Sequence, residues 1–125
     1  MALSIGIEDR TAGAHVITLV GRLDTTTAPE LDRALDALLP NPAVQRLVFD
    51  LERLEYLSSA GIRCFIRARK QIEARNGRVA LVSPQPPVRK VLEIVKAMPL
   101  NGIFSNTAEL DSYLHDMQER ARRGE

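Results

Sequence analysis

The stretch DLERLEYLSSAGIR, residues 50–63, is the centre of the fold that the sequence predicts. An apolar run at residues 47–49 leads into it, and an amphipathic segment at residues 62–73 leads out. A buried strand followed by an amphipathic helix is typical of α/β proteins. Two neighbouring hydroxyl groups, those of Ser58 and Ser59, therefore lie where a loop becomes a helix. If the chain has a side chain that reacts or is modified, we expect it at this junction.

Two periodicities alternate over the rest of the chain. Residues that alternate apolar and polar, and short apolar runs, predict strands, whereas apolar residues three and four apart predict helices. Buried strands that alternate with helices imply a mixed, mostly parallel sheet. We therefore expect one α/β domain with four to five strands and about four helices. In chain order the expected segments are strands 3–7 and 15–20, helix 27–39, strand 46–51, helix 62–73, strand 79–82, helix 88–95, a short strand at 103–104, and helix 110–117.

Local details accompany these segments. Strands 3–7 and 15–20 are expected to form a hairpin. Thr27 and Glu30 fit a capping box, in which each side chain accepts a backbone N–H at the helix start. The run at 46–51 predicts an inner strand covered on both faces. Asn76-Gly77 predicts the end of helix 62–73.

Length and composition narrow the class of protein. At 125 residues the chain makes one domain, which we place at residues 1–118, followed by a charged tail at 119–125 that we expect to fray. Hydrophobic residues make up 45% and charged residues 26%, and the net charge of +1 gives no reason to expect a nucleic-acid partner. The single cysteine, Cys64, fits a reducing compartment. No apolar run approaches the roughly 20 residues of a membrane span, and no secretion signal opens the chain. These features predict a cytoplasmic protein without membrane insertion.

Ser58 and Ser59 have two competing interpretations. Serine is favoured before a helix because its side chain accepts hydrogen bonds from free backbone N–H groups, so the pair can simply cap the helix. Alternatively, one of the two is phosphorylated. A phosphate there would meet the free N–H groups of Ala60 and Gly61 and the positive end of the helix dipole. The small neighbours would leave room for a kinase, and the phosphate would add nearly two negative charges.

Three blocks of sequence then point to one family. The first is LVGRLD at residues 19–24, the second is the apolar strand that ends in Asp50-Leu51, and the third is YLSSAGIR at residues 56–63. Together with the helix that ends at Asn76-Gly77 and the segments after it, they resemble a STAS domain of the anti-sigma factor antagonist family. The resemblance covers about the whole chain.

The resemblance implies a phosphorylation site. In that family the loop commonly has the form Asp-Ser-(Ser or Thr)-Gly-Leu, and alignment on Gly61 places the acceptor at Ser59. Ser58 stands where the family usually has the aspartate. It is therefore an alternative acceptor, and the departure leaves open whether this member is phosphorylated. The predicted partner-binding residues around the acceptor are Asp24, Thr25, Thr26, Ser58, Ala60, Gly61, Arg63 and Arg67.

Two of these predictions compete with simpler interpretations. Asp24 can be a loop aspartate that binds its own backbone. The resemblance instead places it beside the phosphorylation loop, where its carboxylate would repel a phosphate. Arg63, Arg67 and Lys70 can form a solvated helical face, or they can meet an acidic patch on a partner. Cys64 is expected to be a small, partly buried filler of the core.

The resemblance also implies a binding cycle. The unphosphorylated chain would bind an anti-sigma factor, a Ser/Thr kinase of the histidine-kinase-like ATPase type, and thereby release a sigma factor for transcription. Phosphorylation of Ser59 would end the binding, and a separate Ser/Thr phosphatase would reset it. ATP and Mg would belong to the kinase, so we expect no cofactor and no metal in this chain. Both a monomer and a homodimer remain open.

Two rival functions are weighed beside it. One is a phosphorylation-independent STAS adaptor in a signalling scaffold or a lipid-transport complex, which the serine at position 58 favours. The other is a hydrolytic enzyme that uses Ser59. The enzyme lacks an evident base, because His15 and His115 have neither metal-ligand spacing nor a partner motif, and Glu52 and Glu55 are expected in a loop. We therefore predict a binding protein that is not an enzyme.

Overall fold

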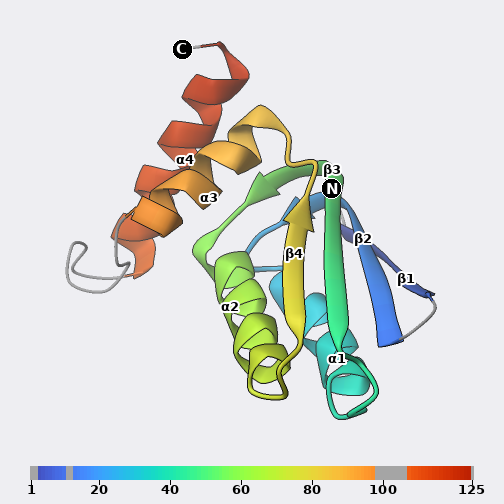
Figure 1. Cartoon of the computed structure of the whole chain (residues 1–125). Coiled ribbons are helices and arrows are strands. Elements are labelled where there is room, and N and C mark those ends of the chain that lie inside the picture. The colour runs from blue at the N-terminus through green and yellow to red at the C-terminus, as the bar shows by residue number, and fades with distance from the viewer. Residues whose placement is uncertain (1–2, 11–12, 98–106, 125) are drawn as a thin grey trace.

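The fold is seen in a computed structural model, which describes residues 3–10, 13–97 and 107–124 (Figure 1). Its helices and strands follow the predicted order. They are β1 (Leu3–Asp9), β2 (Ala14–Leu23), α1 (Ala28–Leu38), β3 (Arg46–Leu57), α2 (Ser59–Glu73), β4 (Arg78–Val82), α3 (Pro86–Ala97) and α4 (Thr107–Arg122). The short strand expected at 103–104 lies outside the described residues.

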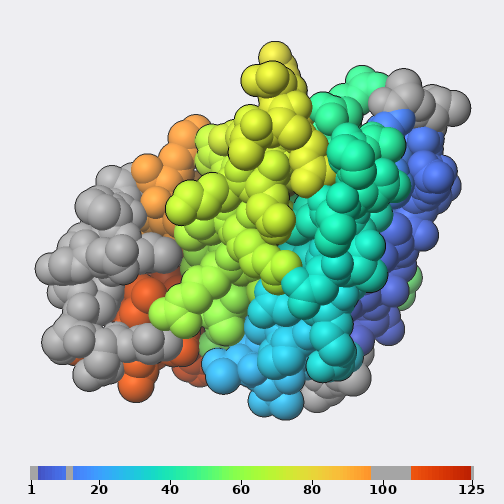
Figure 2. All heavy atoms as spheres, turned by 90° about the horizontal axis from the view of Figure 1, so that it is seen from below, coloured from blue at the N-terminus to red at the C-terminus, as the bar shows by residue number. Residues whose placement is uncertain are grey.

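The sheet is mixed and mostly parallel, as predicted. Its strand order is β1-β2-β3-β4. β1 and β2 form the expected antiparallel hairpin, and β3 and β4 join in parallel through crossovers that contain α1 and α2. The two crossover helices lie side by side, as Figure 2 shows from below. The predicted α/β class is therefore confirmed.

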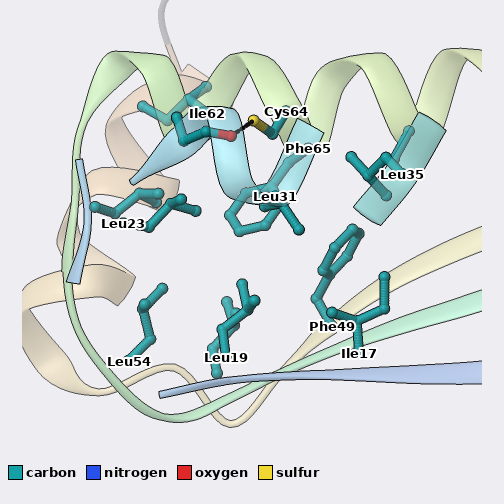
Figure 3. Packing of buried hydrophobic residues seen from close by; sticks show 14 of the residues in the cluster. Ile17, Leu19, Leu23, Leu31, Leu35, Phe49, Leu54, Ile62, Cys64 and Phe65 are labelled. Carbon is teal, nitrogen blue, oxygen red and sulfur yellow. Dashed lines mark hydrogen bonds between the residues drawn. The ribbon is translucent and has the colours of Figure 1, made fainter. Parts of the chain in front are cut away.

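The core lies between the sheet and this helical layer. Ile17, Leu19 and Phe49 point from the strands towards Leu31 and Leu35 of α1 and Phe65 of α2 (Figure 3). The rings of Phe49 and Phe65 meet at 4.8 Å between centroids in a tilted arrangement. Each fully buried side chain of this size contributes roughly 1.5–3 kcal/mol to folding. This packing positions the ends of β2 and β3.

Only one face of β3 is deeply buried, so the expectation of burial on both faces is wrong. Leu47, Phe49 and Leu51 are fully buried, whereas Val48 and Asp50 on the opposite face are half-buried. β4 is also only half-buried or exposed along its length, and within the described residues it is an edge strand. A continuous apolar run therefore marked an inner strand correctly but overstated its burial.

β3 continues six residues beyond the predicted strand end. Residues 52–57, expected in a loop, pair with the last residues of β2, as far as the pair Leu23–Leu57. The register shifts twice along this pairing, between Thr18 and Val20 and between Gly21 and Arg22. These irregularities break the strict alternation that a sequence pattern needs, so the extension left no clear period of two. Glu52 and Glu55 are strand residues.

The helix stop at Asn76-Gly77 is confirmed. Asn76 takes a left-handed conformation with φ of 62°, and the N–H of Gly77 donates to the carbonyl of Ile72 at 2.9 Å. A Cβ at position 77 would lie 2.2 Å from the carbonyl oxygen of Gln45. Glycine is therefore required there by close approach of the backbone to the β3 side of the sheet.

α3 and α4 pack against each other beside the end of the sheet that β3 reaches (Figure 1). On α4, Leu110 and Leu114 are buried as the helical spacing predicted. The helix continues through Arg122, so most of the charged segment expected to fray is helical. Among the described residues, no helix has the length and apolarity needed to cross a membrane.

Candidate phosphorylation and partner-binding site

The predicted site residues gather where β2 and β3 end. Because the two strands are parallel, their carboxyl ends lie at the same edge of the sheet. The last pair is Leu23–Leu57, and the N–H of Ser58 donates to the carbonyl of Leu23 at 2.9 Å. The loop that begins at Asp24 and the start of α2 therefore lie next to each other, as predicted.

Ser58 caps α2. Its backbone is extended, with φ of −101° and ψ of 174°, and its Oγ accepts the N–H of Gly61 at 3.4 Å. Its carbonyl accepts the first helical hydrogen bond, from Ile62. The capping interpretation of the serine pair is therefore confirmed for Ser58.

Ser59, the first residue of α2, is held by a residue from the far end of the chain. Its Oγ donates to Oδ1 of Asp111 in α4 at 2.6 Å, and its backbone N–H donates to the same oxygen at 3.0 Å. A hydrogen bond to a carboxylate at this distance is short and charge-assisted. The residue Ser59 is only 1% exposed, and Ser58 is 4% exposed.

The small neighbours do not open the site to a kinase in this conformation, contrary to expectation. Gly61 is buried, and a Cβ there would lie 2.6 Å from Cγ of Leu23 and 2.7 Å from Cδ1 of Leu57. The glycine thus lets the helix start pack closely on the ends of β2 and β3. α4 covers Ser59 from the other side.

Further polar contacts attach α4 to the end of β3. Nε2 of the fully buried Gln118 donates to the carbonyl of Leu57, and its Oε1 accepts the N–H of Leu57, both at 2.8 Å. This pair of bonds replaces those that a neighbouring strand would make, because β4 pairs only as far as Asp50. Sequence reasoning missed both Asp111 and Gln118.

Tyr56 adds an aromatic contact to α4. Its hydroxyl lies 3.2 Å from Nδ1 of His115, and the guanidinium of Arg22 lies 4.0 Å from the centre of its ring. Burial is the main cause that raises the pKa of Tyr56; Arg22 lowers it, and Asp111 and Asp24 raise it. The phenol therefore stays protonated and can donate a hydrogen bond to Nδ1 of His115.

Asp24 organises its own loop. Its Oδ1 accepts the backbone N–H groups of Thr26 and Thr27, each at 3.0 Å, and its carbonyl accepts the N–H of Ala28. Oγ1 of Thr27 accepts the N–H of Asp24 at 2.9 Å and donates to the carbonyl of Arg22 at 2.8 Å, so it makes no capping bond to α1. The expected capping box of Thr27 is therefore wrong, and the backbone-binding interpretation of Asp24 is confirmed. Thr25 and Thr26 are exposed.

Replacement of Asp24 by alanine is expected to lower the free energy of unfolding by about 1–2 kcal/mol. The reason is that the N–H groups of Thr26 and Thr27 lose a carboxylate acceptor in a partly buried loop. Urea denaturation measures the change. Asp24→Asn keeps an acceptor oxygen and is the matched control, which should lose less than half as much; equal losses would contradict this account.

The basic side chains of α2 differ in their surroundings. Arg67 binds two carboxylates of α1, those of Asp36 and, at 3.1 Å, Asp32, and the hydrogen bond to Asp36 is the main cause that raises its pKa. It therefore links α2 to α1, while Arg63 is exposed. Cys64 is the buried filler that was expected: its Sγ lies 3.8 Å from the carbonyl oxygen of Ala28 (Figure 3), and burial raises its thiol pKa to about 12.

The geometry invites comparison with known proteins. The STAS domain family matches residues 7–110. The chain belongs to the STAS domain family. The predicted family is therefore confirmed. Among the residues that the structure describes, no group of three His, Cys, Asp or Glu side chains is placed to hold a metal ion.

The named relatives share one description. BtrV of Bordetella bronchiseptica, which carries the name of an anti-sigma factor antagonist, is 35% identical over 69% of this chain and 73% of its own length. An anti-sigma F factor antagonist of Lysinibacillus sphaericus is 30% identical over 62% of this chain and 67% of its own. The solved structures of the Bacillus protein SpoIIAA, in unphosphorylated and phosphorylated forms, are both 27% identical with a TM-score of 0.63, and cover 73% and 74% of this chain and 83% of their own.

Proposed function

We propose that this STAS domain is an anti-sigma factor antagonist that binds its partner unphosphorylated and is released when Ser59 is phosphorylated. One observation carries the proposal: Ser59 opens α2 directly beside the Asp24 loop, in a chain whose relatives are named anti-sigma factor antagonists. The solved relative SpoIIAA is known in two phosphorylation states, which supports a covalent switch in this family.

The chemistry of the switch follows from charge. A phosphate on Ser59 adds nearly two negative charges at the end of the sheet where Asp24 and Asp111 already lie. The N-terminus of α2 offers the phosphate partial compensation through its dipole. A partner surface that fits the neutral serine would have to bury this charge or be displaced by it. The predicted contact residues Thr25, Thr26 and Arg63 are exposed around this position.

The proposal assigns each step to a protein. The partner is an anti-sigma factor with Ser/Thr kinase activity, which supplies ATP and Mg and transfers the phosphoryl group to Ser59. A separate phosphatase removes it. This chain acts in the cytoplasm, where sigma factors act, and contributes an acceptor and a binding surface, so it is a binding protein and not an enzyme.

The direct experiment is to locate the phosphate. Incubation with the cognate kinase and ATP, followed by mass spectrometry of peptides, should place one phosphate on Ser59. Ser59→Ala should lose it, and Ser58→Ala should keep it. A phosphate on Ser58 in the wild-type chain would overturn the assignment of the acceptor.

A second candidate is a STAS adaptor that works without phosphorylation. Two observations favour it: serine occupies position 58, and the hydroxyl of Ser59 is buried against Asp111. Absence of any phosphate after incubation with the kinase would support this alternative. Purification of the partners then separates the two candidates, because an adaptor would be recovered with a large scaffold or a transporter ATPase, and an antagonist with a small kinase.

A further inference from the structure

Helix α4 stands between the acceptor serine and any kinase. Ser59 is 1% exposed. Its Oγ, the atom that would receive the phosphoryl group, donates a hydrogen bond to Oδ1 of Asp111 in α4 at 2.6 Å. The phosphorus of the donor must come within bonding reach of that oxygen, with the attacking and leaving oxygens roughly in line. In the observed conformation, therefore, Ser59 cannot be phosphorylated.

Apolar and polar contacts together hold α4 over the serine, and the polar ones lie on one stripe of the helix. Asp111, His115 and Gln118 recur at spacings of four and three, and they meet Ser59, Tyr56 and Leu57 respectively. Of these three polar side chains only Gln118 is fully buried, and the adjoining Leu110 and Leu114 are buried in the hydrophobic core. Net contributions of hydrogen bonds to stability are small because water can replace each partner. Detachment of α4 would therefore be resisted mainly by the exposure of Leu110 and Leu114, while the contacts of the sheet with α1 and α2 do not involve α4.

A phosphate and the docked helix exclude each other. The phosphorus would replace the hydroxyl proton that Ser59 now donates to Oδ1 of Asp111, so this hydrogen bond would be lost. The phosphate would then bring nearly two negative charges into contact with a carboxylate, and the N–H of Ser59 could serve only one of the two anions. Detachment would also expose the N–H and carbonyl of Leu57, which Gln118 satisfies in the docked state.

We propose that α4 is a displaceable cover over Ser59: docked, it shields the acceptor from the kinase, and negative charge on Ser59 keeps it detached. This inference deepens the proposed function, on which its kinase measurements rest. It adds an opening step within this chain that limits the rate at which the switch is set.

The first experiment needs no kinase. Hydrogen exchange of α4 backbone amides is compared by mass spectrometry in the full chain, for the wild type, Ser59→Asp and the control Ser112→Asp. Ser112 is exposed on the same helix, so the control adds the same charge without touching Asp111. We expect Ser59→Asp to speed exchange in residues 110–118 at least about tenfold while β2 and β3 stay protected. Equal exchange in the two variants would overturn the proposal.

The second experiment detaches α4 without altering the acceptor. Gln118→Ala removes two buried hydrogen bonds to Leu57 and makes no contact with Ser59, and the exposed Asp116→Asn is its matched control. With the cognate kinase and ATP, Gln118→Ala should raise the initial rate of Ser59 phosphorylation about tenfold over the wild type, as expected if the fraction of open molecules rises by that factor. Asp116→Asn should match the wild type.

The outcomes separate the two proposals. Equal rates for Gln118→Ala and the wild type would overturn the cover while leaving the proposed function intact. Absence of phosphate on Ser59 in every variant would overturn the proposed function, and the exchange experiment would still decide whether charge at Ser59 releases α4. If Ser59→Asp loses protection in β2 and β3 as well, the released unit is the whole domain and the proposal of a detachable helix fails.

Discussion

Ser59→Asp and Ser59→Glu are expected to weaken binding to the anti-sigma factor at least about a hundredfold, whereas Ser59→Ala keeps it. A carboxylate at position 59 places charge at the centre of the proposed contact surface, beside Asp24 and Asp111. Repulsion and desolvation of that charge amount to a few kcal/mol, and each 1.4 kcal/mol is a factor of ten in affinity. Isothermal titration calorimetry with the purified anti-sigma factor measures the change.

The control for charge alone is Ser112→Asp, which adds a carboxylate to the exposed face of α4 and should bind as the wild type does. Ser59→Ala removes the hydroxyl that donates to Asp111, so its binding also shows that this hydrogen bond is not part of the contact. Undiminished affinity of Ser59→Asp, or loss of binding in Ser59→Ala, would contradict a switch by phosphorylation of Ser59.

Phe49→Ala is expected to lower the free energy of unfolding by about 3–5 kcal/mol, the largest effect on stability that we predict. Phe49 is fully buried in the first half of β3, and its ring packs against that of Phe65 in α2. Truncation removes the apolar contacts and leaves a cavity that the surrounding strands and helices cannot close. Denaturation by urea, followed by circular dichroism, measures the loss.

Ile66→Ala is the matched control for Phe49→Ala. Ile66 follows Phe65 in α2 but is 48% exposed. Its truncation should therefore lower the free energy of unfolding by less than about 1 kcal/mol. Phe49→Leu retains most of the buried apolar volume and should fall between the two variants. If Phe49→Ala were no less stable than Ile66→Ala, the position of the core between β3 and α2 would be wrong.

Local sequence patterns account for most features of the fold that were predicted correctly. The periods of two and of 3.6 residues reflect which side chains face the core, and this property is readable from neighbours in the chain. The order of strands and helices, the hairpin of β1 and β2 and the stop at Asn76-Gly77 all follow from such signals. The STAS resemblance rested on the same local blocks, which is why it survived comparison with known proteins.

Errors arose where a hydrogen-bond partner outside the predicted helix or strand decides the local structure. β3 extends to Leu57 because β2 runs beside it and supplies hydrogen-bond partners across two irregularities of register. Thr27 makes no cap because its Oγ1 accepts the N–H of Asp24 instead and donates to the carbonyl of Arg22, both of which precede the helix. In both cases the residues themselves permit either conformation, and the neighbouring chain selects one.

The amino-acid sequence alone determined the α/β class, a cap within the pair Ser58-Ser59 and the position of this pair at the start of a helix, since these depend on residues within a few positions of one another. The tertiary structure alone decided that Ser59 is covered. Asp111 lies 52 residues away in the chain, and a polar pair at that separation leaves no period or spacing that a sequence pattern could detect. Only the packing of α4 against the end of β3 brings the carboxylate and the hydroxyl together.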